Sequence, residues 1–349
     1  MRHEGQWILI EGPFEPVKNA NSSANSSEIS VFWPDFYELE GKPLFQGTVT
    51  YELKSSDIQQ ICESYLRANA VSDGPQSKIL GKAPWREPLQ EHFATALISM
   101  LAKIKDGEIQ KAVPAVFART AQTVSPHDLA QMIFNLSKAP ETLHVYGFWQ
   151  NGEGVLGATP EVLFDFDFGI LKTMALAGTC PKSESTERES LLKDPKEMQE
   201  HGLVVEDLKS RLAKWGSVKT EGPKILELPT LFHLKTDFVV KCHATPNFRK
   251  LTEELHPTPA LGVAPRSAGY KWMAEYPGQE GRRGFGGPFA FFDQNKALCL
   301  VGIRNLQWNS EEAMIGSGCG VVAASELDRE WRELFQKRLS VKKILGLEL

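Results

Sequence analysis

Segments with the pattern of β-strands follow one another along this chain, with few helical segments between them. Apolar runs bounded by Gly or Pro occur at residues 7–12, 30–39, 111–119, 143–149, 154–166, 169–176, 228–242, 288–293 and 297–308. Helices are predicted in three longer stretches, at 85–105, 186–215 and 323–346. A parallel sheet needs a crossover connection, usually a helix, between successive strands. The clustering therefore predicts an α+β protein with largely antiparallel sheets, in which 288–293 and 297–308 pair across a turn near Asn295.

Local signals suggest where two of these helices begin and end. Pro195 is tolerated in a first helical turn, so a break near Asp194 is expected within 186–215. Ser325 is a candidate N-cap of the last helix, and Gly346 lies near its end. The polar run at residues 19–28 predicts a loop.

Charge and cysteine usage narrow the class of protein. The 349 residues carry a formal net charge of −5, and scattered Lys and Arg favour neither nucleic acid nor an anionic membrane as partner. The five cysteines lie far apart and lack CxxC spacing, which is typical of a reducing cytosol. No apolar stretch reaches the length of a membrane span. We therefore expect a soluble, cytoplasmic protein.

Two predicted helices each carry a pair of glutamates on one face. Glu330, Glu333 and Lys337 are spaced i, i+3, i+7, and Glu197 and Glu200 are spaced i, i+3. A single such pair is more often a solvated face with a Glu333–Lys337 ion pair. Two pairs together offer the oxygen ligands that Mg²⁺ prefers, although spacing alone does not bring the two helices into contact.

Four further features are each ambiguous by themselves. Lys111 begins an apolar strand, where desolvation would suit a general base, but a strand-end lysine reaching water is commoner. Glu161 opens an apolar run, where burial would keep a general acid protonated, but an ordinary strand-edge glutamate is commoner. The glycine-rich segment 316–320 could bind a carboxylate through its amides or form a plain tight turn. His256 is held rigid by two nearby prolines and lacks a partner at metal-binding spacing.

Nine motifs, taken together and in order, resemble a known family. They are GATPEVLF, MALAGT, DPKEMQEH, LPTLFHL, HPTPAL, RRGFGG, VGIRN, GSGCGVV and SELDREWRELFQK, and they are similar to those of the chorismate-utilising enzymes. That family comprises the isochorismate, salicylate, anthranilate and aminodeoxychorismate synthases. The resemblance covers about residues 108–345 and implies one large α+β domain, with two antiparallel sheets packed face to face and helices outside. Residues 1–100 match poorly and are expected to be a shortened N-terminal part of that domain, and 101–349 the chorismate-binding catalytic region.

The resemblance also implies roles for individual residues. Lys111 falls on the family's water-activating lysine and Glu161 on its general acid. Mg²⁺ would be held by Glu200 and Glu333, with Glu197 and Glu330 in the same cluster. The groups expected to contact chorismate are Gly178, Thr179, His256, Ala260, Phe285, Arg304, Gly318, Cys319, Gly320 and Lys337.

A few positions separate the subfamilies. The ammonia-using members generally lack the lysine matched by Lys111, and aminodeoxychorismate synthases carry a nucleophilic lysine where this chain has Ala177. Salicylate synthases tend to have Thr and Tyr where this chain has Ala260 and Phe285. The resemblance thus implies an isochorismate synthase, which adds water at C2 of chorismate and expels the C4 hydroxyl.

Other readings remain open. The alternatives are a salicylate synthase, an ammonia-using anthranilate or aminodeoxychorismate synthase subunit, and an inactive member that only binds its ligand. Val116, Val263 and Cys319 depart from the usual family residues without removing a proposed catalytic group. We expect a monomer that needs no glutaminase subunit, and both menaquinone and siderophore biosynthesis are possible pathways.

Overall fold

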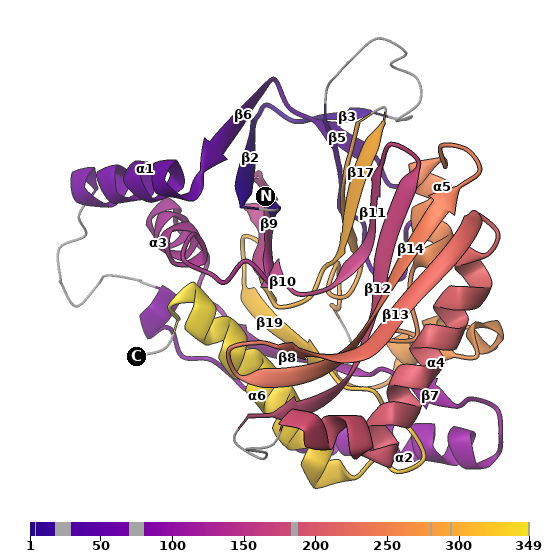
Figure 1. Cartoon of the computed structure of the whole chain (residues 1–349). Coiled ribbons are helices and arrows are strands. Elements are labelled where there is room, and N and C mark those ends of the chain that lie inside the picture. The colour runs from indigo at the N-terminus through magenta and orange to yellow at the C-terminus, as the bar shows by residue number, and fades with distance from the viewer. Residues whose placement is uncertain are drawn as a thin grey trace.

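Two large antiparallel sheets form the body of the molecule (Figure 1). The computed structural model describes residues 1–3, 5–17, 29–69, 80–182, 188–279, 281–293 and 295–347. The loop predicted at 19–28 lies outside these residues. Within them, one sheet has eight strands and the other nine, and a separate two-stranded ribbon pairs β7 (Lys111–Ala112) with β15 (Val263–Ala264). The predicted α+β architecture is confirmed.

The eight-stranded sheet combines strands from the beginning, middle and end of the chain. Its order is β6 (Val49–Lys54), β2 (Gln6–Glu11), β1 (Arg2–His3), β9 (His144–Gln150), β10 (Glu153–Thr159), β18 (Asn305–Trp308), β19 (Ala313–Gly318) and β8 (Ala115–Thr120). Residues 316–318 of the glycine-rich segment 316–320 therefore form the end of strand β19, where they pair with β8.

The nine-stranded sheet contains three neighbouring strands of 12 residues each. Its order is β13 (Gly216–Glu227), β14 (Leu231–Cys242), β12 (Ile170–Pro181), β11 (Val162–Asp167), β17 (Lys296–Val301), β16 (Pro288–Phe292), β4 (Ser30–Phe32), β5 (Leu44–Gln46) and β3 (Glu15–Val17). The predicted pairing of the segments on either side of Asn295 is confirmed as β16 with β17.

Two segments expected to be single strands instead pass from one sheet to the other. The segment 154–166 divides into β10 and β11 at Pro160–Glu161, and the segment 297–308 divides into β17 and β18 at residues 302–304. The two crossings are adjacent, because Val301 N–H donates to the Glu161 carbonyl at 3.1 Å and Ala158 N–H donates to the Arg304 carbonyl at 3.2 Å. The hydrophobic pattern of the sequence does not reveal these crossings, because the residues on both sides are buried in one sheet or the other.

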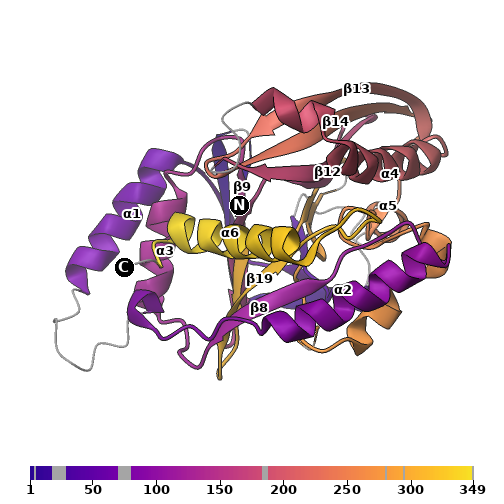
Figure 2. The same ribbon diagram turned by 90° about the horizontal axis from the view of Figure 1, so that it is seen from below.

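Six α-helices surround the sheets in the described residues. They are α1 (Ser55–Ala68), α2 (Gln90–Lys105), α3 (Pro126–Leu136), α4 (Pro195–Leu212), α5 (Phe248–Leu255) and α6 (Leu327–Leu345). Short 3₁₀ turns occur at Leu80–Lys82, Arg188–Lys193, Arg266–Ala268 and Lys271–Glu275. Figure 2 shows α6 between the layer formed by β12–β14 with α4 and the layer formed by β8 with α2. The glutamate-bearing helices α4 and α6 therefore approach the same strand, β12, from two sides.

The helix boundaries follow most of the local signals. The predicted break near Asp194 is confirmed, because the Asp194 carboxylate caps α4 by accepting from the N–H groups of Lys196 and Glu197 at 2.9 and 3.2 Å. Gly346 ends α6 in a left-handed conformation, as expected. The N-cap assignment of Ser325 is wrong, because α6 is capped by Glu326 and the Ser325 hydroxyl accepts from Val322 N–H instead. Helix α2 starts at Gln90, five residues after the predicted start.

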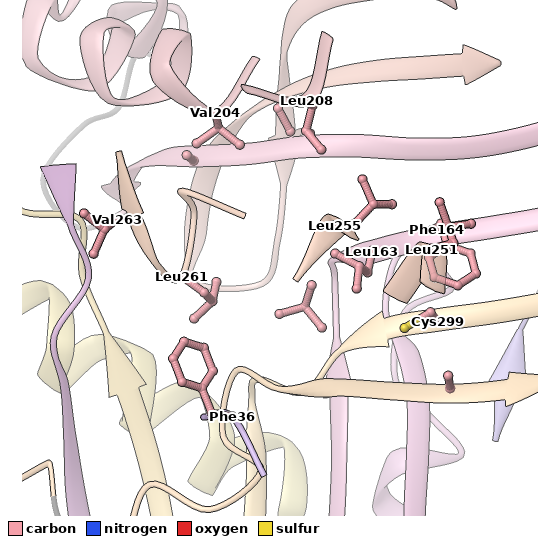
Figure 3. Packing of buried hydrophobic residues seen from close by; sticks show 14 of the residues in the cluster. Phe36, Leu163, Phe164, Val204, Leu208, Leu251, Leu255, Leu261, Val263 and Cys299 are labelled. Atoms are coloured by element: carbon pink, nitrogen blue, oxygen red, sulfur yellow. The ribbon is translucent and has the colours of Figure 1, made fainter. Parts of the chain in front are cut away.

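Two layers of apolar packing hold this arrangement together. Between the sheets, Tyr146 lies 4.8 Å from Phe289, ring centre to ring centre, in a cluster that includes Val155 and Leu300. On the nine-stranded sheet, helix α4 packs against β12 and β14, and its Val204 and Leu208 share one buried cluster with Leu251 and Leu255 of α5. Figure 3 shows Leu251 and Leu255 near Leu163, Phe164 and Cys299 of the same cluster. This packing fixes the position of α4 on the sheet.

Candidate active site

A cavity lies where the two sheet crossings meet the glycine-rich segment. Ten of the residues singled out in the sequence line it: Glu161, Thr179, Glu200, Ala260, Phe285, Arg304, Gly318, Cys319, Gly320 and Lys337. Its free volume is about 60 Å³, far below the several hundred Å³ of typical ligand pockets. A substituted six-membered ring can therefore enter only if side chains in its walls move.

Glu161 is a buried carboxyl at the corner between β10 and β11. Only 3% of the residue is exposed. Burial raises the pKa of Glu161 to about 8, although the nearby charges of Lys111, Lys337 and Arg304 act to lower it. The carboxyl is therefore mostly protonated at neutral pH and can donate a proton into the cavity.

Lys111 is fully buried directly behind the cavity wall. Its ammonium nitrogen lies 3.0 Å from Glu200 Oε1. Strand β7 is held in place by hydrogen bonds between Ala112 and Val321. A side chain at Gly320 would collide with the Glu200 carboxylate, and its Cβ would lie 2.8 Å from Lys111 Cε. Position 320 must therefore be glycine for the Lys111–Glu200 pair to reach the cavity.

Arg304 and Lys337 contribute positive charge from opposite parts of the fold. Arg304 has a positive φ of 56° at the second sheet crossing, and its guanidinium donates to Ser340 Oγ of α6 at 2.8 Å. Lys337 donates to the Gly318 carbonyl at 2.8 Å and lies 2.5 Å from Glu333 Oε1. Both cations line the cavity, so the cavity is suited to a ligand that carries carboxylates.

Four buried glutamates from α4 and α6 form a single cluster around Lys196. The lysine ammonium lies 3.1 Å from Glu197, 2.9 Å from Glu330 and 3.8 Å from Glu200. Burial acts to lower the pKa of Lys196, but the charges of the four glutamates, Glu333 included, raise it. This cluster, named here the glutamate cluster, consists of Glu197, Glu200, Glu330 and Glu333.

The carboxylates of the glutamate cluster differ in their protonation. Burial and the charge of Glu200 raise the pKa of Glu197 to about 7. Burial and the charge of Glu333 raise the pKa of Glu330. Burial also acts to raise the pKa of Glu200, but Lys111 and Lys196 lower it below its ordinary value. The cluster is therefore short of positive charge, and an added cation would stabilise its ionised form.

The donors of the glutamate cluster suit a hard divalent cation. Mg²⁺ takes oxygen ligands, and both carboxylate oxygens of Glu330 are buried without a hydrogen bond, although Lys196 lies within ion-pairing distance. In the described part of the chain no three acidic, His or Cys side chains converge closely enough to hold a metal. The chemistry of the residues fits Mg²⁺, and three of the four carboxylates contact the ammonium of Lys196.

Strand β12 joins the glutamate cluster to the cavity. Gly178 occupies a bulge with a φ of +82°, so Thr179 N–H points to Glu197 Oε2 and donates to it at 2.8 Å. Thr179 Oγ1 lies 3.0 Å from His233 Nδ1, and His233 Nε2 lies 3.4 Å from an Arg304 nitrogen. Thr179 lines the cavity, whereas Gly178 shapes the strand behind it.

The structure corrects the expectation that His256 contacts the ligand. Its ring lies outside the cavity, where Nε2 donates to the Phe36 carbonyl at 2.9 Å and the ring packs edge-on against Phe36. The rigid HPTPAL segment instead presents Ala260 and Leu261 to the cavity.

Sequence reasoning also missed functional neighbours. Lys196 was passed over, although its spacing of i, i+4 from Glu200 places it on the same helical face. His233 in the LPTLFHL motif lines the cavity. Arg329 donates to Glu197 Oε1 at 2.9 Å, and only the meeting of α4 with α6 shows this contact.

Comparison with known proteins agrees with this architecture. The model of the chorismate binding enzyme family matches residues 35–346. This chain therefore belongs to the chorismate-binding enzymes.

Individual relatives have related names. The chain is 27% identical over 298 residues to the salicylate biosynthesis isochorismate synthase of Pseudomonas aeruginosa, covering 82% of this chain and 61% of that protein. It is 31% identical over 336 residues to the chloroplastic isochorismate synthase of Catharanthus roseus, covering 90% and 57%. The chain thus spans about three fifths of the length of these two relatives.

A solved structure shows the same fold. MenF, the menaquinone-specific isochorismate synthase from Escherichia coli, superposes with a TM-score of 0.76 at 18% identity, over 99% of this chain and 87% of that chain. Among the helices in the described residues, none combines the length and apolar composition needed to cross a bilayer.

Proposed function

We propose that this chain is an isochorismate synthase, which converts chorismate to isochorismate with Mg²⁺ as cofactor. In this reaction a water oxygen bonds to C2 of the ring, the bond from C4 to its hydroxyl breaks, and the ring double bonds shift. The observation that carries the proposal is a cavity lined by both a protonated, buried Glu161 and Glu200, which pairs at 3.0 Å with the buried Lys111. Such a pair of opposed proton-transfer groups suits an exchange of hydroxyl positions on a ring.

Glu161 supplies the proton for the departing hydroxyl. With a pKa of about 8, it holds its proton at neutral pH and gives it up when negative charge develops on the C4 oxygen. After proton transfer the carboxylate faces the positive charges of Lys111, Lys337 and Arg304. These charges stabilise the anion formed in the step.

Lys111 is the candidate group that takes a proton from the attacking water. A lysine that pairs with Glu200 at 3.0 Å must first release a proton before it can act as a base. It is fully buried beside Glu200 and Gly320, which both line the cavity, so its amine is shielded from solvent next to the cavity wall.

The two carboxylates of chorismate would be bound at separate places. Arg304, Lys337 and the backbone of residues 318–320 line one part of the cavity and would hold one carboxylate. Glu200 and Glu333, with Glu197 and Glu330 beside them, would hold Mg²⁺. When bound, Mg²⁺ would neutralise the other carboxylate and polarise the ring.

The residues in the cavity favour water over other nucleophiles. Ala177 lines the cavity without a reactive group, so a lysine-nucleophile route lacks its residue. Ala260 and Phe285 line it without the hydroxyls that the family's pyruvate-eliminating members tend to carry at these positions. We extend the proposal to a monomer of the cytoplasm that works without a glutaminase subunit. Its pathway could be menaquinone or siderophore biosynthesis.

One incubation tests the proposal. Purified full-length protein is mixed with chorismate and Mg²⁺, the products are separated, and pyruvate is assayed directly. Isochorismate in equilibrium with chorismate, with little pyruvate, is the expected result. Stoichiometric pyruvate with salicylate would identify a salicylate synthase instead, and an aminated product that requires ammonia would overturn the role given to Lys111. No conversion under any condition would indicate a protein that only binds its ligand.

A further inference from the structure

We infer that Lys196 is an internal counter-ion of the glutamate cluster, which competes with the divalent cation and so sets the affinity for metal. The inference rests on the proposed function, because it takes the glutamate cluster as the metal site. It adds a residue that neither binds the metal nor reacts with the substrate, yet determines how much metal the enzyme needs.

The position of the Lys196 ammonium is the first observation. Lys196 lies in the first turn of α4, and its nitrogen contacts Glu197 and Glu200 of its own helix and Glu330 of α6. Only 5% of its side chain is exposed, and the Glu197 and Glu330 side chains are fully buried. The ammonium therefore occupies the space between the two helices that carry the carboxylates.

The other cations near the cluster do not share this position. Lys111 contacts Glu200, Lys337 contacts Glu333, and Arg329 contacts Glu197, each from the edge of the cluster. Lys196 contacts three of the four glutamates at distances of 2.9 to 3.8 Å. Arg329 of α6 reaches Asp194 and Glu197 at the start of α4, whereas Lys196 contacts glutamates of both helices.

A metal and this ammonium cannot both lie among these oxygens. Mg²⁺ requires its oxygen ligands at about 2.0–2.1 Å. A Mg²⁺ ion bound to Glu200 and Glu333, with Glu197 and Glu330 beside it, would therefore lie within a few Å of a lysine nitrogen that contacts Glu197, Glu200 and Glu330. Two cations at such a separation in a buried site repel strongly. The ammonium lies 2.9 to 3.8 Å from oxygens of Glu197, Glu200 and Glu330 and so occupies space that the ion would need.

The position of Lys196 at the N-terminal end of α4 allows its ammonium to move out of the cluster toward water. Lys196 follows Pro195, which is exposed at the N-terminal end of α4. The flexible four-carbon stem of a lysine can carry its charged end toward water while its backbone stays in the helix. Metal binding would then exchange an internal cation for an external one, and the protein would keep its buried carboxylates neutralised in both states.

The test compares metal binding by the wild type and three variants, all treated with a chelator. In Lys196→Met the charge is removed and the length of the side chain is kept, whereas Lys196→Arg keeps the charge on a bulkier group. Lys209→Met on the same helix is the matched control, because Lys209 pairs with Glu206 at 3.1 Å on the exposed face. Binding of Mn²⁺ is measured by electron paramagnetic resonance and calorimetry, and the melting temperature is measured with and without Mg²⁺.

Lys196→Met should bind Mn²⁺ at least about tenfold more tightly than the wild type, because the competing charge is gone. Its melting temperature without metal should fall and should recover with Mg²⁺ by a larger step than in the wild type. Lys196→Arg keeps the competing charge, so it should bind Mn²⁺ no more tightly than the wild type and should melt near the wild-type temperature. The test therefore remains valid if the methionine variant does not fold. Lys209→Met should match the wild type in both measurements.

Unchanged or weaker Mn²⁺ binding by Lys196→Met, or tighter binding by Lys196→Arg, would overturn the inference and leave the proposed metal site standing. Absence of Mn²⁺ binding by the wild type, with chorismate present or absent, is a different outcome. It would overturn the metal requirement in the proposed function, and with it the competition.

Discussion

Glu161 and Arg304 lie on adjacent segments that cross between the two sheets, and the backbone of each segment is hydrogen-bonded to the other. The Glu161 carbonyl accepts from Val301 N–H at 3.1 Å, and the Arg304 carbonyl accepts from Ala158 N–H at 3.2 Å. Position 157 of strand β10, just before the first crossing, must be glycine, because a Cβ there would come within 2.5 Å of the Arg304 carbonyl oxygen. A proton donor and a cation are thus fixed relative to each other by two sheets rather than by a loop.

Replacing Glu161 by Gln should separate activity from stability. Turnover should fall by on the order of 10²-fold or more, the usual scale for a general acid. The folded carboxyl keeps its proton up to a pH of about 8 because burial raises its pKa, whereas the unfolded chain loses that proton near pH 4.5. The folded wild type therefore loses stability as pH rises from 4.5 to 8, and Glu161→Gln does not.

Turnover and urea unfolding of both proteins between pH 6 and 9 check this prediction. Wild-type turnover should fall above a pH of about 8, and Glu161→Gln should unfold at a higher urea concentration than the wild type at the alkaline end. A variant with full activity, or with the same pH dependence of unfolding as the wild type, would contradict the assignment.

Adding a single methyl group at position 320 should damage the site without unfolding the protein. The new Cβ in Gly320→Ala collides with the Glu200 carboxylate and crowds Lys111, so the pair would shift out of position. A displacement of this size commonly costs on the order of 10²-fold in turnover. Gly202→Ala is the control, since position 202 in α4 has open space around its Cβ and alanine favours a helix. Turnover assays and melting curves for both variants check this prediction. Wild-type turnover by Gly320→Ala would show that a Cβ at position 320 does not displace Glu200 and Lys111.

Sequence spacing was enough to predict which carboxylates belong together. A helix places residues three apart on one face, so the pairs Glu197–Glu200 and Glu330–Glu333 followed from periodicity. That α4 and α6 meet, and that the ammonium of Lys196 lies between them, depends on how both helices pack against β12. Periodicity within one segment holds no information on such a contact.

The two sheet crossings and the position of His256 show a different limit of prediction from sequence. Residues 154–166 and 297–308 are largely apolar on both sides of each crossing because each part is buried in one of two sheets, so the hydrophobic pattern does not mark the change of sheet. His256 lies in a motif that resembles the family's, and it was expected at the ligand. It instead lies outside the cavity and binds the Phe36 carbonyl, an arrangement that a motif cannot distinguish from direct contact with a ligand.

Neutralising Glu333 should raise the metal requirement. Glu333→Gln removes one charged ligand of the proposed Mg²⁺ site and the partner of Lys337, whose nitrogen is 2.5 Å away. The Mg²⁺ concentration for half-maximal activity should increase by about tenfold or more, the scale seen when groups around a metal site are changed. Glu206→Gln, on the exposed side of α4, should leave that concentration unchanged. Wild-type activity of Glu333→Gln at limiting Mg²⁺ would show that the carboxylate does not serve the metal.

His256 should make the protein sensitive to acid. Burial lowers the pKa of its ring to about 3, and Nε2–H is already committed to the Phe36 carbonyl, so a second proton would have to be placed on a buried nitrogen. An unfolded histidine titrates near pH 6.5. The unfolded chain therefore binds more protons than the folded chain between pH 6.5 and about 3, and stability falls as pH decreases through this window. At pH 5 the loss from this residue is about 2 kcal/mol, because each pH unit below 6.5 contributes about 1.4 kcal/mol.

His256→Gln keeps a donor for Phe36 but cannot take up the proton, so its free energy of unfolding should fall less between pH 7.5 and 5 than that of the wild type. His243→Gln, at an exposed position, should behave as the wild type does. Urea unfolding at both pH values measures the difference, and an equal fall in wild type and His256→Gln would mean that the buried ring accepts a proton without penalty.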